Sequence, residues 1–193
     1  LVPDFGQTAF DEVRLNLGPF EQTFEENRAF FTEGVELFNK GEIFFSRRIG
    51  GPPSGSIEDL NVNEAITETP SNVNILNAIK VSGRTKKGLG VGFLNSITER
   101  TYATITDTVS ETIRKKMIEP ITNYNVFVLD QVFNGNSSVS LINTNVLRDG
   151  SDFRDANVTA GVFSIADKEN RFRTSGRAIF SNVNDGEGFK TGF

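Results

Sequence analysis

Cysteine, histidine and tryptophan are all absent from this chain. The lack of cysteine excludes a disulfide framework and a thiolate metal site. The lack of histidine removes the commonest general base and the commonest metal ligand, so catalysis would have to use carboxylates, lysines or hydroxyls. We therefore expect a protein that is not an enzyme and that holds no cofactor or metal.

Long hydrophobic runs and basic tracts are lacking as well. No apolar run approaches the ~18 residues of a membrane-spanning helix, but β-barrel strands are only ~9–11 residues long and half polar. The net charge of −5 and the pI near 4.9 argue against a nucleic-acid partner. The chain opens without a signal peptide or an initiator methionine, so we interpret it as a mature or trimmed piece of a longer protein.

What the chain does contain is polar and apolar alternation. In Arg171–Phe180, three arginines and a serine occupy every second position, and mostly small or apolar residues lie between them. A strand sends successive side chains to opposite faces, so this segment has one charged face and one apolar face. Similar alternation predicts further strands at 73–82, 89–93, 124–133, 139–147 and 158–166, and one that begins at Gly188.

Short and long connections alternate between these strands. Short turns lie near residues 86, 135 and 168, and longer connections lie near residues 60, 108, 152 and 185. Outer-membrane β-barrels have this organisation, with short turns in the periplasm and long loops outside the cell. The pattern therefore predicts an all-β fold, an antiparallel meander of about eight strands that forms part of a transmembrane outer-membrane β-barrel. A soluble antiparallel sandwich has similar strand spacing and stays as the alternative.

The first third of the chain follows a different pattern. We expect a short strand at Asp11–Leu17 and, from the helical spacing of its aromatic residues, a short helix at Asn27–Phe38. A strand at Ile43–Ile49 would be the first of the barrel, and a long loop would follow it as far as Asn72.

Residues 101–117 fit two structures. Four apolar residues would form a stripe along a helix, whereas the density of threonine and isoleucine suits a long hairpin that projects past the sheet. We favour the hairpin. The residues of the alternative helical stripe are Ile105, Val109, Ile113 and Met117.

Five segments carry a resemblance to a known family: PDFGQ (3–7), FEENRAFFTEGVELF (24–38), FSRRIGG (45–51), EPITNYNVFVLDQ (119–131) and NSSVSLINTNV (136–146). They resemble an uncharacterised outer-membrane family that is common in Bacteroidota. In that family a family-9-like carbohydrate-binding sandwich typically precedes a large β-barrel domain of unknown function. The resemblance implies that residues 1–193 are the start of the barrel domain, and that the strands at Ile43 and Gly188 pair with segments outside this chain.

One departure from that family concerns the aromatic residues. Barrel girdles usually favour Trp and Tyr. This chain has no Trp and only 2 Tyr, and its 18 Phe would have to take their place.

Two groups of charged residues are candidate functional sites. An acidic cluster at 25–36 lies near several arginines, and it could provide a glycosidase carboxylate pair ~5–10 Å apart. We favour an ion-pair network that holds a plug-like segment against the barrel wall, because buried charges are normally paired. The network residues are Glu25, Glu26, Arg28, Glu33, Arg47 and Arg48, with Glu36 nearby, and the expected lumen-facing residues are Arg171, Arg173 and Arg177.

The sequence therefore predicts two parts. Residues 1–40 would form a periplasmic, plug-like lead-in with a short helix, and residues 41–193 would form the first strands of the barrel. We expect a non-enzymatic protein of the bacterial outer membrane that passes a ligand, handles it at the cell surface or serves as a subunit of an envelope complex. Its expected partners are outer-membrane lipid, a glycan and other envelope proteins. The glycan rests on family architecture alone. The alternative is a soluble carbohydrate-binding or carbohydrate-active β-protein.

Overall fold

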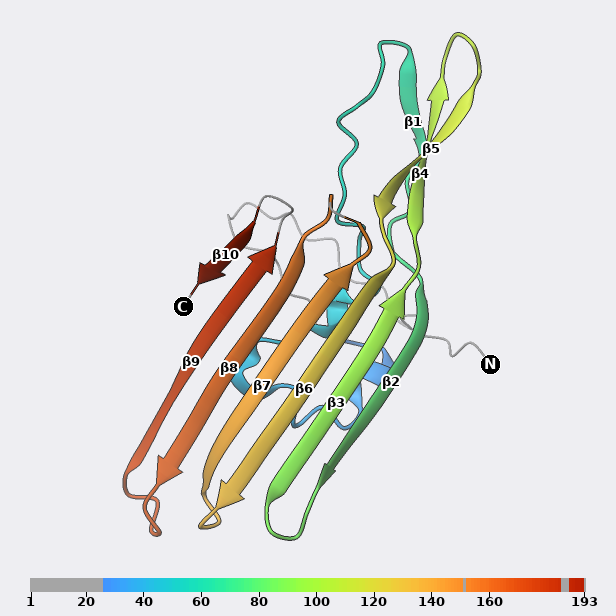
Figure 1. Cartoon of the computed structure of the whole chain (residues 1–193). Helices are drawn as coiled ribbons and strands as arrows, with labels where there is room; N and C mark the ends of the chain where they lie inside the picture. The colour runs from blue at the N-terminus through green and yellow to red at the C-terminus, as the bar shows by residue number, and fades with distance from the viewer. Residues whose placement is uncertain (1–25, 151, 185–187, 193) are drawn as a thin grey trace.

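Two antiparallel sheets make up the part of the chain that the computed structural model describes, residues 26–150, 152–184 and 188–192. The larger sheet has seven strands in the order β10-β9-β8-β7-β6-β3-β2, and the smaller has three in the order β1-β4-β5. Figure 1 shows the smaller sheet projecting from one end of the larger one, while the short turns lie at the opposite end. The prediction of an all-β antiparallel fold is confirmed.

The larger sheet is a meander interrupted once, where the chain leaves it after β3 and returns at β6. The strands predicted from the alternation are confirmed, each shifted by a few residues at its ends. Asn134 and Gly135 both have positive φ in the three-residue turn between β6 and β7, a conformation that asparagine and glycine adopt more readily than other residues. The strands are β2 (Ile75–Arg84), β3 (Leu89–Thr98), β6 (Thr122–Phe133), β7 (Ser137–Arg148), β8 (Asp155–Ala166), β9 (Arg173–Asn184) and β10 (Phe189–Gly192).

The smaller sheet settles the ambiguous segment at 101–117. The chain forms the strands β4 (Thr101–Asp107) and β5 (Ile113–Glu119), so the hairpin is confirmed and the helix is excluded. A third strand, β1 (Glu64–Glu68), pairs with β4. The prediction of a continuous loop as far as Asn72 was therefore wrong at β1, which is too short for its alternation to stand out from a Thr- and Glu-rich stretch.

The seven-stranded sheet has two unlike faces. Residues 26–51, which we call the docked segment, pack on one face, and we call this the inner face and the opposite one the outer face. The inner positions of β3 are small or apolar, whereas the charged residues of the inner face belong to the other strands. Every charged residue of the seven strands except Asp155 lies on the inner face by register. These residues are Lys80, Arg84, Asp130, Arg148, Arg173, Arg177 and Lys190.

The outer face is largely apolar. Twelve of its large hydrophobic side chains are at least 38% exposed. A contiguous apolar surface of this extent on a folded protein usually marks a contact with a partner or a membrane. The residues are Ile79, Val81, Leu89, Val91, Phe93, Phe127, Val139, Leu141, Leu147, Phe163, Ile165 and Phe180.

The docked segment is mostly irregular. It contains one short helix, α1 (Ala29–Thr32), and two single 3-10 turns, η1 (Lys40–Glu42) and η2 (Ser46–Arg48). The prediction of a helix over Asn27–Phe38 was therefore too long. Glu33 leaves α1 in an extended conformation and Gly34 has a φ of +59°, so the helix ends after one turn.

The predicted strand at Ile43–Ile49 was wrong. This stretch contains η2 and has no strand partner among the described residues, because it lies across the inner face instead of beside a strand edge. The first strand of the larger sheet is β2. The predicted strand at Asp11–Leu17 lies outside the described residues.

The larger sheet is open. Within the described residues β2 and β10 are its edges, and the two strands do not pair with each other. No helix in the described part of the chain is long and apolar enough to span a membrane.

The core lies between the docked segment and the centre of the inner face. Phe38 is fully buried, and its ring lies against Gly92, where an added Cβ would come within 3.1 Å of it. Leu37 lies in the same way against Gly90. The two glycines of β3 thus provide the space that the side chains of the docked segment occupy. The core residues are Phe31, Leu37, Phe38, Ile49, Leu94, Tyr124, Val126, Val128 and Ile142.

We expect Phe38→Ala to loosen the docked segment. Removing a fully buried phenylalanine costs about 3–5 kcal/mol, since both the transfer energy and the packing are lost. Hydrogen exchange of residues 26–51 should become markedly faster, whereas Phe172→Ala, at a side chain that is 75% exposed, should leave it unchanged. Equal exchange in both variants would contradict the packing described here.

Candidate functional site

Two cations contact Asp130 of β6 on the inner face. Its carboxylate is fully buried and contacts Lys40 Nζ of the docked segment at 2.8 Å and Arg84 Nη2 of β2 at 2.6 Å. Ser140 Oγ of β7 donates a third hydrogen bond at 2.6 Å. Arg84 also lies 3.7 Å from Glu36 Oε1, so two cations and two anions balance one another. The cluster joins the docked segment to three strands.

Gly90 makes this cluster possible. Arg84, Gly90, Asp130 and Ser140 follow one another in register across β2, β3, β6 and β7. Arg84 must therefore reach over β3 to contact Asp130, and an added Cβ at Gly90 would lie 3.3 Å from its guanidinium. The missing side chain at Gly90 leaves a path for the arginine as well as space for Leu37.

The electrostatics favour an ionised Asp130. Burial acts to raise the pKa of this carboxyl, but hydrogen bonds from Lys40, Ser140 and Arg84 outweigh it, and the pKa lies below its ordinary value. An Asp with a depressed pKa in the folded state stabilises the fold above its unfolded pKa of about 3.9. This stabilisation is lost as the pH falls through the depressed value.

Other strands contact the backbone of the docked segment. Lys80 Nζ donates to the carbonyl oxygens of Phe30 and Glu33, and its ring contact with Phe30 has an Nζ-to-centroid distance of 5.0 Å. Arg177 of β9 donates to the carbonyl of Gly41 at 3.2 Å and to the carboxylate of Glu42 at 3.1 Å. Cationic side chains thus satisfy the carbonyls that an irregular segment leaves without partners.

A second cluster holds the docked segment together internally. The Arg28 guanidinium forms a salt bridge to Glu26 at 2.7 Å and donates to the carbonyl oxygens of Ser46 and Ile49. Burial acts to raise the pKa of Glu26, but hydrogen bonds from Arg28 and Ser46 lower it below its ordinary value. Arg28 therefore ties the two ends of the docked segment to each other.

The residues of the predicted ion-pair network do not form a single cluster in the structure. Glu26 and Arg28 pair directly, whereas Glu33 meets Lys80 through its carbonyl oxygen. Arg47 and Arg48 lie in η2, where the Arg48 carbonyl oxygen is 3.5 Å from Tyr124 Oη. Glu25 lies outside the described residues.

The three arginines expected to share a face lie in two places. Arg173 and Arg177 are on the inner face by register, and Arg177 contacts the docked segment. Arg171 lies in the turn before β9 and pairs with Asp167 and Glu169 of the same turn. Whether the inner face lines a lumen stays a prediction.

Sequence reasoning missed the cluster around Asp130. One signal was available, because Asp130 is a lone charge in the series of inner positions Val126 and Val128. Lys40 gave no such signal, since it contacts Asp130 from an irregular segment 90 residues earlier in the chain.

A buried glutamate secures the junction of the two sheets. Glu119, at the end of β5, accepts hydrogen bonds from the amide and the hydroxyl of Ser54 at 2.7 and 2.6 Å. Thr122 and Arg148 donate to its other carboxylate oxygen. This site fixes the chain that leads away from the docked segment against the start of β6.

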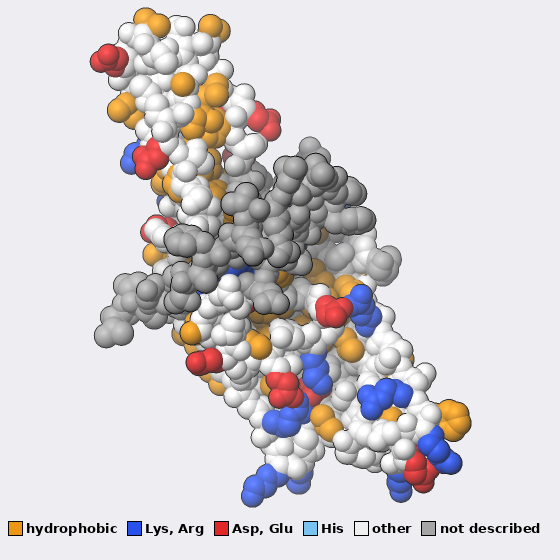
Figure 2. Space-filling view, turned by 180° about the vertical axis from the view of Figure 1, so that it is seen from behind, with side chains coloured by type: hydrophobic (Ala, Val, Ile, Leu, Met, Phe, Trp, Pro, Cys, Tyr) orange, Lys and Arg blue, Asp and Glu red, His pale blue; other side chains and the backbone are white. Residues whose placement is uncertain are grey.

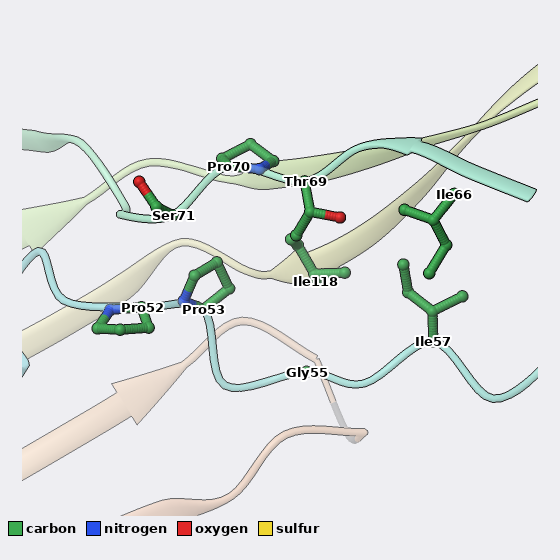
Figure 3. Close-up of a pocket in the computed structure, with 9 residues that line it drawn as sticks. All are labelled: Pro52, Pro53, Gly55, Ile57, Ile66, Thr69, Pro70, Ser71 and Ile118. Atoms are coloured by element: carbon green, nitrogen blue, oxygen red, sulfur yellow. The ribbon is translucent and has the colours of Figure 1, made fainter. Parts of the chain in front are cut away.

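A shallow pocket of about 370 Å³ lies close to this junction. Three isoleucines and three prolines form most of its lining, and Figure 3 shows Ile57 and Ile66 pointing towards each other. Its lining holds no charged side chain, so the pocket offers an apolar surface without groups for acid-base chemistry. The lining residues are Pro52, Pro53, Gly55, Ile57, Ile66, Thr69, Pro70, Ser71 and Ile118.

The site as a whole is arranged to hold a segment. Within the described residues no cluster of three or more acidic or other ligating side chains could hold a metal ion. The carboxylates of Glu26 and Asp130 are both engaged by cations and hydroxyls. Figure 2 shows this face of the molecule, with Lys and Arg side chains gathered toward the end that has the short turns.

Asp130→Asn should weaken the docked segment at neutral pH and remove part of its acid sensitivity. Breaking a buried ion pair by removing one partner costs about 3–5 kcal/mol. In the unchanged protein, protection of residues 26–51 from hydrogen exchange should decline as the pH falls below about 4. In the variant the protection should be lower at pH 7 and decline less on acidification.

A matched control is Asp149→Asn, which removes the exposed pair with Arg100. Exposed pairs contribute about 0–1 kcal/mol, so this variant should keep the original pH profile. If Asp130→Asn also kept that profile, the Asp130 cluster would not hold the segment.

Comparison with known proteins places the chain in a family without assigning an activity. No curated protein and no solved structure matches it. One family model does match, and it covers residues 1–193. The chain belongs to the family described as the domain of unknown function DUF5916.

Proposed function

We propose that this chain forms part of the wall of an outer-membrane β-barrel, and that the docked segment narrows the lumen. The barrel is non-enzymatic and passes a ligand, or handles it at the cell surface. The observation that carries the proposal is the placement of charge. Every charged residue of the seven strands except Asp155 lies on the inner face, and Asp155 is the first residue of β8, at the long-loop end.

This placement of charged residues is the reverse of that found in a soluble antiparallel sheet. An antiparallel sheet with one solvated face turns its polar residues outward and its apolar residues to the core. Here the outer face holds the exposed hydrophobic residues. Four charged residues of the inner face contact the docked segment, namely Lys80, Arg84, Asp130 and Arg177. Strands of a membrane barrel alternate in this sense, apolar towards lipid and polar towards the interior.

Strand length supports the same proposal. The strands β6, β7, β8 and β9 each have 12 residues, and β2 and β3 have 10. A tilted strand needs about 9–11 residues to cross a bilayer. Short turns at one end and the long projection of β4 and β5 at the other fit the unequal ends of such barrels.

The docked segment supports the idea of a narrowed lumen. It covers the centre of the inner face with Phe38, and its backbone accepts hydrogen bonds from strands at both sides of the sheet, β2 and β9. Irregular backbone at membrane depth is tolerated only inside protein or beside a water-filled cavity. A segment on the inner face of a barrel satisfies that condition.

A soluble carbohydrate-binding β-protein is the second candidate. The amides of Asn95, Asn123 and Asn125 are joined by hydrogen bonds on the outer face. Phe93 occupies the next outward position of β3 after Asn95. Amides beside an aromatic ring can bind a sugar. Detergent dependence separates the two proposals. A full-length protein that purifies folded without detergent would contradict the membrane wall.

Charge placed on the two faces should have unequal effects. Ala178→Arg adds a charge to the outer face, and Ser175→Arg adds the same charge to the inner face of the same strand. An arginine facing lipid near the midplane costs about 2–4 kcal/mol. We expect Ala178→Arg to reduce assembly into outer membranes strongly and Ser175→Arg to have a small effect, as measured by the membrane-inserted fraction. Equal assembly of the two variants would contradict the assignment of faces.

Loosening the docked segment should raise conductance. Phe38→Ala removes its main apolar contact with the inner face, and Phe93→Ala makes the same change on the outer face. In planar bilayers the full-length Phe38→Ala protein should show larger or more frequent openings than the unchanged protein, and Phe93→Ala should not. Unchanged conductance, together with faster hydrogen exchange of residues 26–51, would show that the segment does not restrict a lumen.

A further inference from the structure

Five asparagines form one line across the outer face. Asn95 pairs with Asn125, Asn125 with Asn145, Asn145 with Asn157, and Asn157 with Asn182, each directly opposite the next. Directly opposed residues of antiparallel strands place their side chains on the same face. The line therefore crosses β3, β6, β7, β8 and β9 at one level, and we call it the asparagine row.

Amides in and beside the row bond to one another. Asn95 Nδ2 donates to Asn125 Oδ1 at 2.8 Å and to Asn123 Oδ1 at 2.7 Å. Asn143 Nδ2 donates to Asn157 Oδ1 at 3.1 Å and to Thr159 Oγ1 at 2.8 Å. Amides that pair in this way need fewer partners from solvent, so they tolerate a less polar surrounding than free amides would.

The outer face changes from mostly apolar to more polar at this row. Between the row and the short turns the outward positions of the sheet include no charged residue, and most are apolar. The successive lines on that side begin with Phe93 and Phe127, continue with Val91 and Leu129, and then reach Leu89. On the other side of the row the outward positions include Asn77, Asn123, Asp155 and Asn184 beside Ile97 and Leu147.

We propose that the asparagine row marks the level at which the outer face leaves the hydrocarbon of the membrane. The surface between the row and the short turns contacts acyl chains, and the amides contact the headgroup layer on the long-loop side. This inference rests on the proposed membrane wall and adds the depth at which it sits.

The height of the apolar surface agrees with this assignment. From Asn125 to Phe133 the strand rises about 27 Å, at ~3.4 Å per residue. At a strand tilt of ~35–45° this corresponds to about 20 Å along the membrane normal, close to the ~25 Å apolar band of outer-membrane barrels. Lipid is the occupant that fits, because the surface is broad, apolar and without charge.

The chain is well suited to a depth measurement, because it contains no cysteine. Single cysteines at Asn123, Asn125, Phe127 and Leu129 sample successive outward positions of β6. A cysteine at Asn157 samples the row on a second strand, and one at Ser175 samples the inner face. Each full-length variant would be labelled with a fluorophore and reconstituted in phosphatidylcholine vesicles that contain either brominated acyl chains or a nitroxide headgroup.

We expect the acyl quencher to act strongly at Phe127 and Leu129 and at least threefold less at Asn123. The headgroup quencher should act most strongly at Asn125 and Asn157, to the same extent at both. The label at Ser175 should respond weakly to both quenchers. Two different depths for Asn125 and Asn157, or equal acyl quenching at Asn123 and Phe127, would overturn the assigned boundary while leaving the membrane wall intact.

A failure of the membrane wall itself would look different. In that case no outer label would be quenched in vesicles, and the protein would stay folded without detergent. Binding of a soluble oligosaccharide that Asn125→Ala abolished in such a protein would assign the row to the carbohydrate-binding alternative and overturn the inference.

A second experiment moves the boundary. Asn125→Leu with Asn145→Leu extends the apolar surface by one line of residues, about 5 Å along the membrane normal. Assembly of this double variant should fall severalfold in vesicles of short-chain lipid and stay unchanged in long-chain lipid, because the mismatch arises only in the thin bilayer. The control, Thr144→Leu, makes a similar change on the inner face of β7 and should show no dependence on chain length. An equal response of the two variants would contradict the boundary.

Discussion

The charge that the strands place on one face is the constraint on which the rest of this structure depends. A strand has two faces, so turning charged residues inward leaves an outer surface that is almost entirely uncharged. The inner face then needs a cover that supplies both apolar contacts and hydrogen-bond acceptors. The docked segment supplies both, with the Phe38 ring at its centre and carbonyl oxygens that accept from Lys80 and Arg177. An irregular segment suits this role better than a helix, because its carbonyls are free to accept side-chain donors.

Asp130 is where these requirements meet. Its burial is tolerated because Lys40, Arg84 and Ser140 all contact it, and two of these groups come from different strands. Arg84 reaches it only because Gly90 lacks a side chain. A single glycine thus serves both the electrostatics of the cluster and the packing of the docked segment. Changes at Gly90, Arg84 or Lys40 should therefore be coupled and not additive in their effects on docking.

Membership of the DUF5916 family assigns no activity, so function has to be argued from the two faces of the sheet. In the proposed arrangement the docked segment on the inner face narrows a lumen, and the outer face contacts lipid up to the asparagine row. Glu26, one of the carboxylates considered for a glycosidase pair, is held by Arg28. The depth of the outer face in the membrane and the restriction of a lumen by the docked segment can be measured independently.

The sequence by itself determined the strands of the larger sheet and the face to which each residue points, because the side-chain period of two is a local property of the chain. The same reasoning failed for the docked segment, where a helix was predicted at Asn27–Phe38 and a strand at Ile43–Ile49, since contacts with distant strands outweigh local propensity there. Reasoning from the sequence found the Glu26–Arg28 pair, whose residues lie two positions apart, but it did not find the contact between Lys40 and Asp130. Only the tertiary structure decided that contact and the asparagine row, because register and docking arise from pairing between residues far apart in the chain.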